Sequence, residues 1–245
     1  MNATHDSETK IRVPEPADAT ATSSAPAAMP SAHHLVGQSS ARVEALADGV
    51  FAIAMTILVF DLQLPESDQP LGQALRALAP KLLAFALSFA LLGIYWAGHR
   101  GQFHYIRHAD HVLHWINILL FALVSLVPFS AKVLGRHSGT VLGQALYGAN
   151  LIAIGVVLYW HWRHASRRHL LIDQDVPAAV VRGAVMRCLV APACYLVAIG
   201  VAVLDTRVSL VMFLCVPALY ILPWLQGFWW KLSGAGGGAP VVPKR

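Results

Sequence analysis

The stretch RVEALADGVFAIAMTILVFDLQLP, residues 42–65, is the most informative part of this sequence. From Val43 to Leu64 it is mostly apolar, and it is about as long as the ~20 residues that a helix needs to cross a hydrocarbon core. Asp48 lies within it, although an ionised side chain at membrane depth costs about 3 kcal/mol on insertion scales. The stretch therefore predicts a spanning helix in which Asp48 needs polar partners and is a candidate functional residue.

At about 100° per residue, this helix has two different faces. One face is apolar with a single hydroxyl, and its members are Gly49, Ile53, Thr56, Ile57 and Phe60. Asp48 lies roughly 140° away from Ile53, so the acidic side of the helix is separate from this stripe. If the apolar face lined a pore, it would form a narrow hydrophobic constriction. Periodicity alone favours another interpretation, a helix–helix contact that Gly49 and its small neighbours would allow.

The composition of the whole chain is that of a membrane protein. Of its 245 residues, 56% are hydrophobic and only 13% are charged, against about 25% charged in a typical soluble domain. The charges gather between long uncharged stretches, which fits lipid as the solvent for most of the chain. The net charge of +5 is then explained by basic loops and needs no nucleic-acid partner.

Six apolar segments follow one another, each near the length of a membrane span. Their ranges are Val43–Leu64, Leu78–Gly98, Val112–Leu134, Val141–Trp162, Val185–Leu204 and Val208–Trp229. The fifth and sixth are separated only by Asp205-Thr206-Arg207, which predicts a tight helical hairpin. The sequence therefore predicts an all-α polytopic membrane protein with six transmembrane helices.

The Lys and Arg residues predict its orientation and its domains. With six spans, 13 of the 18 Lys and Arg lie on the side of both termini and 5 on the other, so both termini are predicted to be cytoplasmic. Residues 1–38 are rich in Ala, Pro, Ser and Thr and predict a disordered N-terminal tail. Residues 39–232 form the predicted six-helix domain, and the Gly- and Pro-rich residues 233–245 form a flexible C-terminal tail.

Two groups of histidines raise a different possibility. His104, His108, His111 and His114 recur at helical spacing, and His161, His164 and His169 form a second group. Such clusters hold iron in membrane hydroxylases, because imidazole suits that metal, so a histidine-cluster metalloenzyme is one alternative. The groups are loose and we expect no acidic second shell beside them, which favours histidines at the membrane interface and no metal site. A second alternative is a proton- or cation-coupled transporter that uses Asp48 as its ion site.

The first segment also carries a family signature. Arg42 and Asp48 are followed directly by Gly-Val-Phe-Ala-Ile-Ala over 49–54, and Trp96-Ala-Gly-His99 and Asn117 follow in the second and third segments. This pattern resembles the transmembrane protein 175 family of lysosomal and prokaryotic potassium channels, over roughly residues 40 to 230. Leu46 and Ala47 depart from it, because the family has Phe and Ser there. The loss of the Ser hydroxyl removes one polar partner from the surroundings of Asp48.

The resemblance implies a homotetramer of six-helix subunits in the prokaryotic plasma membrane, with a central pore lined by the first helix. It places the pore constriction at Ile53, and the same face adds Gly49, Thr56, Ile57 and Phe60. It also implies a structural or gating network, whose members are Arg42, Asp48, Trp96, His99 and Asn117. No enzymatic activity and no cofactor are implied, and K⁺ is the permeant ion.

An isoleucine ring offers no oxygen to replace the water shell of an ion, and K⁺ holds its shell less tightly than Na⁺. This chain lacks the Thr-Val-Gly-Tyr-Gly run of carbonyl filters, so the isoleucine ring that the resemblance implies would give a mild preference for potassium.

Overall fold

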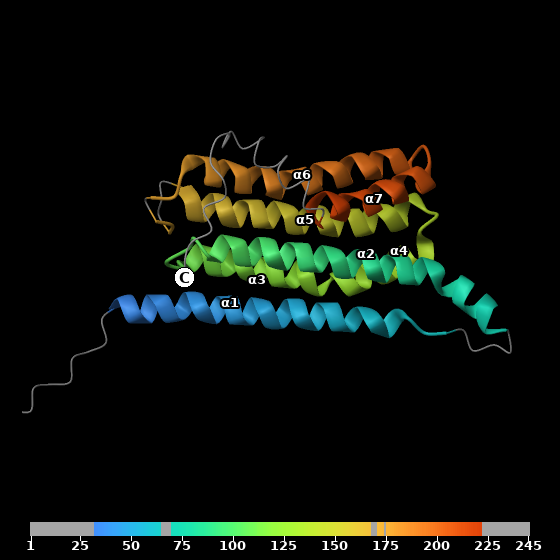
Figure 1. Cartoon of the computed structure of the whole chain (residues 1–245), viewed down its shortest axis with the longest axis horizontal. Coiled ribbons are helices and arrows are strands. Elements are labelled where there is room, and N and C mark those ends of the chain that lie inside the picture. Colours follow the sequence, from blue (N-terminus) through green and yellow to red (C-terminus); the bar gives the residue numbers. More distant parts are fainter. Residues whose placement is uncertain (1–31, 65–69, 168–170, 174, 222–245) are drawn as a thin grey trace, which may run out of the picture.

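The computed structural model describes residues 32–64, 70–167, 171–173 and 175–221. The helices run, in chain order, α1 Ala32–Ile57, η1 Leu58–Asp61, α2 Leu71–Phe103, α3 His111–Ser125, α4 Val127–His137, α5 Val141–Ser166, α6 Ala178–Ala202 and α7 Thr206–Ile221. Within these ranges, the only β-type pairing is an isolated bridge between Ile106 and Ile172. The long helices lie nearly parallel in one bundle (Figure 1).

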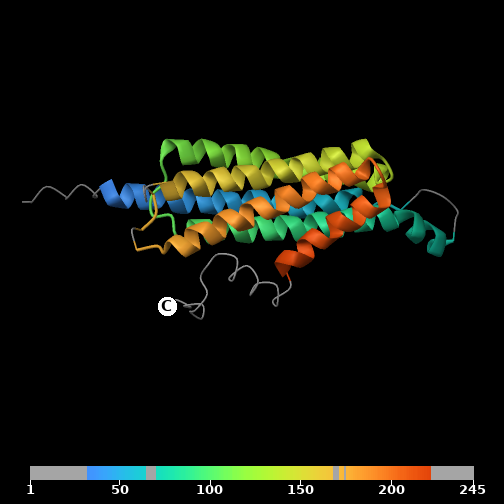
Figure 2. The ribbon, with the colours of Figure 1, turned by 90° about the horizontal axis from the view of Figure 1, so that it is seen from above.

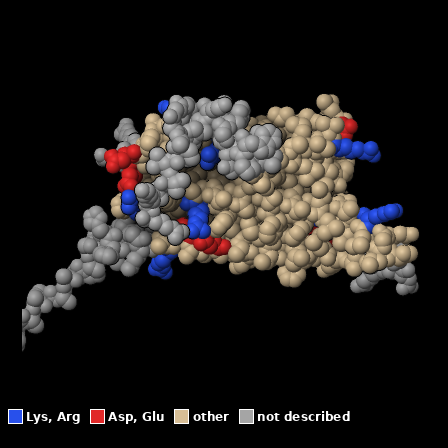
Figure 3. Space-filling view, in the orientation of Figure 1, with Lys and Arg blue, Asp and Glu red and all other residues tan. Residues whose placement is uncertain are grey.

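These helices confirm the prediction of an all-α polytopic membrane protein. Five helical segments are long and apolar enough to span a membrane, and the shorter apolar α7 is a sixth candidate. Its predicted range, Val208–Trp229, continues beyond Ile221, where the described residues end. Charged side chains collect towards the two ends of the molecule and leave a broad uncharged band between them, as a bilayer requires (Figure 3).

The third span is two helices with a break between them. α3 and α4 together cover His111–His137, and Leu126 joins them. Pro128 has no N–H for the carbonyl of Val124, and its ring disfavours a straight continuation of the helix. The hydroxyl of Ser125 donates to the carbonyl of Phe121 at 2.8 Å, so this polar group is satisfied inside its own helix.

The predicted N-terminal tail overlaps the start of α1, and the predicted hairpin is present near the other end of the chain. α1 begins at Ala32 and so includes the last residues of the predicted tail 1–38, while the rest of that tail and residues 233–245 lie outside the described residues. The predicted hairpin between the fifth and sixth segments is present. Asp205 accepts hydrogen bonds from the N–H groups of Arg207 and Val208 and thereby caps the start of α7.

The core of the bundle is built around α5, which contacts α3, α4 and α6. Large side chains at intervals of three and four residues along α5 are almost completely buried: Tyr147, Leu151, Ile154, Leu158 and Trp162. The Tyr95 hydroxyl of α2 donates to the carbonyl of Leu151 at 3.0 Å, and the hydroxyls of Ser88 and Tyr147 lie 3.0 Å apart. Polar groups within the spans are thus paired between helices, as lipid surroundings demand.

α1 lies at the edge of this bundle, against α2 and α3 (Figures 1 and 2). Its buried side chains, together with Leu58 at the start of η1, are spaced by four, four, three and four residues: Val43, Ala47, Phe51, Ala54 and Leu58. This spacing keeps them on a single face of the helix. From Ala41 onwards, the rest of the circumference of α1 is exposed or partly exposed in the chain.

Two glycines let α5 approach its neighbours closely. A Cβ at Gly155 would lie 2.5 Å from the ring of Pro192 on α6, and a Cβ at Gly148 would lie 2.8 Å from Ile199. The proline ring is rigid and cannot turn away. Gly155 is thus required by the contact between α5 and α6.

Replacing Gly155 by alanine is expected to lower the free energy of unfolding by about 1–3 kcal/mol, because the new methyl group overpacks this contact. Thermal melting of the detergent-purified protein measures the change. Gly200→Ala is the matched control, because nothing lies within 4 Å of a Cβ there and helix propensity favours alanine by about 1 kcal/mol. Equal melting temperatures for the two variants would contradict the role of Gly155.

Candidate pore helix and its polar contacts

The apolar stripe predicted on α1 is exposed in the subunit. Ile53, Ile57 and Phe60 are 59%, 44% and 71% exposed, and Gly49 and Thr56 are exposed as well. No atom lies within 4 Å of a Cβ built at Gly49, so this glycine does not serve a close helix contact inside the subunit. The stripe therefore makes no close helix–helix contact among the residues that the structure describes, and a helix–helix contact would have to be with another chain. The stripe is available to lipid, to water or to other subunits.

Thr56 contributes the only hydroxyl of the stripe. Its Oγ1 donates to the carbonyl of Ile53 at 2.9 Å, one turn back along α1. The hydroxyl proton is thereby used within the helix, and the oxygen keeps free acceptor capacity. Any contact of this side chain with a cation on the exposed face would use that oxygen.

Asp48 is paired with the second helix. The indole N–H of Trp96 donates to Oδ1 of Asp48 at 2.7 Å, and the guanidinium of Arg100 lies 5.5 Å from the centre of the Trp96 ring. Asp48 is exposed in the isolated subunit, and so is Arg42. Among the described residues no ion pair joins Arg42 to Asp48, so the predicted network lacks this contact within one chain.

His99 belongs to a second pair. It is almost fully buried, and its Nε2 lies 2.8 Å from Oδ1 of Asn117 on α3. The amide nitrogen of Asn117 donates to the carbonyl of Leu113, so Oδ1 is the acceptor and Nε2 of His99 carries the proton. The network that the resemblance implies contains Asp48, Trp96 and His99 together. The structure gives Asp48 only Trp96, because a step of three residues turns His99 by about 60° towards α3.

A third pair extends this buried polar region and was not predicted. Gln102, one turn after His99, donates from Nε2 to the carbonyl of Leu158, and its Oε1 lies 2.6 Å from Nδ1 of His161 on α5. The rings of His99 and His161 are 5.5 Å apart, so the second and third pairs adjoin. The spacing of Gln102 from His99 was the available sequence signal. His161 was expected at the membrane interface, but it is completely buried because α5 is the central helix.

The other histidines do not form the predicted face. α2 ends at Phe103 and α3 begins at His111, so His104 and His108 lie between helices and do not continue the line of His111 and His114. His164 binds Asp110, so the expectation that these histidines have no acidic partner is wrong, and His169 lies outside the described residues. In the ranges that the structure covers, no three His, Cys, Asp or Glu side chains are placed to hold a metal ion.

The segment between α2 and α3 contacts the end of α5 and the segment that follows it. Ile106 pairs with Ile172, Arg107 forms an ion pair of 2.7 Å with Asp173, and Nε2 of His164 donates to Asp110 at 2.8 Å. Asp110 also caps α3 by accepting from the N–H of Leu113. Partial burial of Asp110 opposes its ionisation, but these two hydrogen bonds outweigh burial and hold the pKa of the carboxyl below its usual value.

At the opposite end of the bundle, η1, which directly follows α1, contacts α4. Oδ1 of Asp61 lies 3.6 Å from Nζ of Lys132 and 3.9 Å from the guanidinium of Arg136. The Asp61 side chain is only 19% exposed, whereas both cations are about half exposed. The exposed stripe thus lies between two polar ties, Asp48 with Trp96 near one end and Asp61 with its cations at the other.

The departures from the family signature fall on different faces of α1. Ala47 is buried on the face that packs against α2 and α3, and Leu46 is 57% exposed. Ala47 supplies packing at this position and no hydrogen bond. The carboxylate of Asp48 therefore depends on the indole of Trp96 within the subunit.

The fold and this site define a class of protein, a polytopic α-helical membrane protein whose first span exposes an apolar face and holds an acid beside it. Residues 42–128 match the family described as the endosomal/lysosomal potassium channel TMEM175. The chain is 32% identical over 177 residues to a potassium channel of Streptomyces collinus, and 31% identical over 175 residues to one of Chamaesiphon minutus. These matches cover 70% and 69% of this chain and 86% of each relative. This chain belongs to the TMEM175 family.

A solved structure agrees with this assignment. The crystal structure of a lysosomal potassium-selective channel TMEM175 homologue from Chamaesiphon minutus superposes with a TM-score of 0.67 at 29% identity. The match covers 76% of this chain and 97% of that one. The family resemblance inferred from the first segment is therefore confirmed.

The contact between Trp96 and Asp48 predicts an energetic coupling. Trp96→Phe keeps the aromatic ring but removes the N–H, and a double-mutant cycle with Asp48→Asn is expected to give a coupling of about 1 kcal/mol or more, because the hydrogen bond is to a charged group. Denaturant unfolding in detergent measures it. Trp115→Phe is the control, since that indole bonds to His111 on its own helix. A coupling as small as that of the control would show that the two side chains act independently.

The lowered pKa of Asp110 predicts a dependence of stability on pH. A carboxyl whose pKa is lower in the folded state stabilises the protein above its unfolded pKa, and this contribution is lost as pH falls through the folded pKa. Between about pH 5 and pH 3 the wild type should therefore lose more stability than Asp110→Asn, which keeps a capping oxygen without the charge. The difference should stay below about 1 kcal/mol, because the side chain is partly exposed. If the melting temperatures of the two proteins fall equally as pH is lowered, the prediction is wrong.

Proposed function

We propose that this chain is one subunit of a homotetrameric, potassium-permeable cation channel whose pore is lined by the exposed face of α1. The observation that carries the proposal is the division of α1 into two faces. One face is packed against α2 and α3, and the other exposes Ile53, Ile57 and Phe60 along its length. The bacterial relatives matched over most of their length are named potassium channels, and the channel homologue of known structure has the same fold.

The constriction of this pore is a ring of Ile53 side chains, one from each subunit. Such a ring offers no polar atom, so an ion passes partly hydrated or sheds water at a cost. Potassium loses its water more readily than sodium, and a moderate preference for potassium follows. The Thr56 oxygen lies one turn further along the pore and has acceptor capacity for the passing cation. Dewetting of the isoleucine ring would close the pore.

The polar pairs give this helix its position. The indole of Trp96 binds Asp48 from α2, while His99 and Asn117 join α2 to α3 behind the pore helix. These residues therefore act by positioning the pore helix and do not touch the ion. Arg42 is exposed near the start of α1, and its long side chain is suited to reach Asp48 of a neighbouring subunit.

The protein functions in the prokaryotic plasma membrane with both termini in the cytoplasm, as the excess of Lys and Arg on that side requires. The potassium ion is the transported substrate, and the mechanism assigns no role to a cofactor. A metalloenzyme is disfavoured, because the family and the matched relatives are ion channels. A proton- or cation-coupled transporter makes a different prediction, since its flux saturates and depends on a second gradient.

Reconstitution into planar bilayers tests the proposal. Purified protein should have the mass of a tetramer, and it should carry a potassium current that persists without a proton gradient. A flux that depends on a proton gradient and saturates would identify the protein as a transporter and not as a channel. Particles of another stoichiometry without an axial opening would refute the pore.

Ile53→Asn is expected to change the ratio of potassium to sodium permeability, because an amide in the constriction offers the ion an oxygen ligand. Reversal potentials under mixed K⁺ and Na⁺ gradients measure this ratio. Ile118→Asn is the control, because Ile118 is similarly exposed, at 48%, but belongs to α3 and lies off the proposed pore. If both variants keep the wild-type ratio, Ile53 does not form the constriction.

A further inference from the structure

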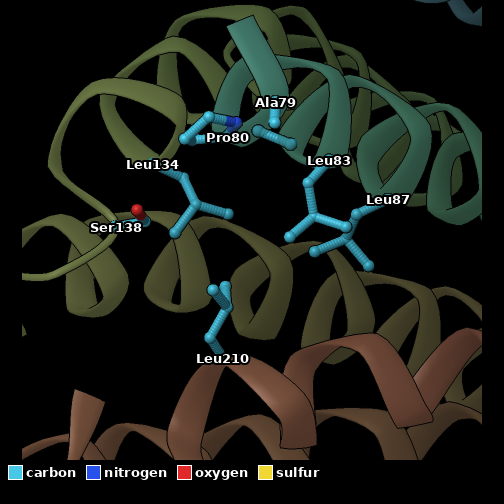
Figure 4. A pocket seen from close by; sticks show the side chains of 8 residues that line it. Ala79, Pro80, Leu83, Leu87, Leu134, Ser138 and Leu210 are labelled. Atoms are coloured by element: carbon cyan, nitrogen blue, oxygen red, sulfur yellow. The ribbon is translucent and has the colours of Figure 1, made fainter. Parts of the chain in front are cut away.

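A partly open cavity of about 270 Å³ lies between α2, α4 and α7, away from the exposed stripe of α1. Pro80, Leu83 and Leu87 enter it from α2, Leu134 enters it from α4, and Leu210 enters it from α7 (Figure 4). Ser138, directly after α4, contributes a polar group to the lining. Water finds few hydrogen-bond partners in such a cavity, whereas hydrocarbon fits its lining.

The cavity lies where the bundle meets the membrane surface. Leu210 is in the second turn of α7, and Leu134 is in the last turn of α4. At the same end, Asp61 pairs with Lys132 and Arg136, and charged side chains of this kind mark the headgroup region. The cavity therefore faces the boundary between headgroups and acyl chains.

A proline in α2 accounts for the opening. Pro80 lies inside the helix and cannot donate to the carbonyl of Arg76, so α2 bends at this point. The first turns of α2 leave the line of the bundle in both views of the ribbon (Figures 1 and 2). α4 stays in close contact with α2 just after the bend, since a Cβ at Gly135 would lie 3.2 Å from Cα of Lys81, and the cavity lies beside this contact, towards α7.

Two arginines lie one turn closer to this end than the cavity lining. Arg76 precedes Pro80 by four residues on α2, and Arg207 precedes Leu210 by three residues on α7, so each shares a helix face with a lining residue. Both arginines are exposed, and neither forms an ion pair with any residue that the structure describes. Asp205, the acid next to Arg207, uses its Oδ1 to cap α7. Two exposed guanidinium groups thus lie one helical turn from the apolar lining of the cavity, on the side of the membrane surface.

We propose that this cavity is a binding site for an anionic phospholipid of the surrounding bilayer. One acyl chain occupies the space between Leu83, Leu134 and Leu210, and the phosphate lies between Arg76 and Arg207. Guanidinium groups bind phosphate oxygens through paired hydrogen bonds, which selects a lipid with net negative charge. The site lies outside the proposed pore, and its existence does not depend on which ion the protein conducts.

Lipid binding by the full-length protein tests this site. Native mass spectrometry of the detergent-purified protein compares phosphatidylglycerol with phosphatidylcholine of the same acyl chains. The wild type should prefer phosphatidylglycerol, and the double variant Arg76→Gln/Arg207→Gln should reduce this preference about 30-fold, because each cation near a membrane surface contributes a factor of about five. The double variant Arg182→Gln/Arg187→Gln is the control. It removes the same charge from α6, outside the residues that line the cavity, and should keep the preference.

A filling variant tests the acyl-chain part of the proposal. Ala79 is exposed and lines the cavity, so Ala79→Phe should fold, which size-exclusion chromatography and circular dichroism verify, and should weaken the binding of both lipids. The proposal is overturned if the Arg76/Arg207 variant keeps the wild-type preference. It is also overturned if Ala79→Phe binds phosphatidylglycerol as tightly as the wild type, or if a neighbouring subunit covers the cavity in the assembled protein.

Discussion

α1 packs against the subunit through a single row of side chains, which runs from Val43 through Phe51 to Leu58. Burying an apolar side chain contributes about 1.5–3 kcal/mol, so these contacts hold the helix more firmly than any of its polar ties. The same row determines what α1 leaves bare. Because the buried residues recur every three or four positions, the residues between them form a continuous exposed stripe centred on Ile53.

The polar contacts at the two ends of the stripe contribute less free energy than the burial of apolar side chains, but they fix the rotational orientation of α1. The ion pairs of Asp61 span 3.6 and 3.9 Å with half-exposed partners, and such pairs contribute about 0–1 kcal/mol. The contact from Trp96 to Asp48, at 2.7 Å, has the length of a direct hydrogen bond, whereas the contacts of Asp61 are longer than one. Together they limit rotation of α1 about its axis, which keeps the stripe facing away from the bundle.

The interior of the bundle follows a different rule, set by the membrane. A hydrogen-bonding group in hydrocarbon has no water to bind, so buried polar side chains are paired across helices. His99 with Asn117, His161 with Gln102, and Ser88 with Tyr147 are such pairs, and each joins segments far apart in the chain. They require a defined register between the helices, which purely apolar contacts would leave less specific.

The sequence by itself determined the spans and the two faces of α1, because hydropathy and the helical period are local properties of the chain. It also indicated the short turn at Asp205, since the separation of two apolar segments can be read directly. Only the tertiary structure decided which partner each polar group binds. Trp96 and His99 are three residues apart and both carry N–H donors, yet one faces α1 and the other faces α3. His161 is buried because α5 became the central helix, and the cavity beside Pro80 lies where α4 ends and α7 begins next to the bend in α2. These outcomes depend on how helices far apart in the chain pack against one another, and such packing cannot be read from local sequence patterns.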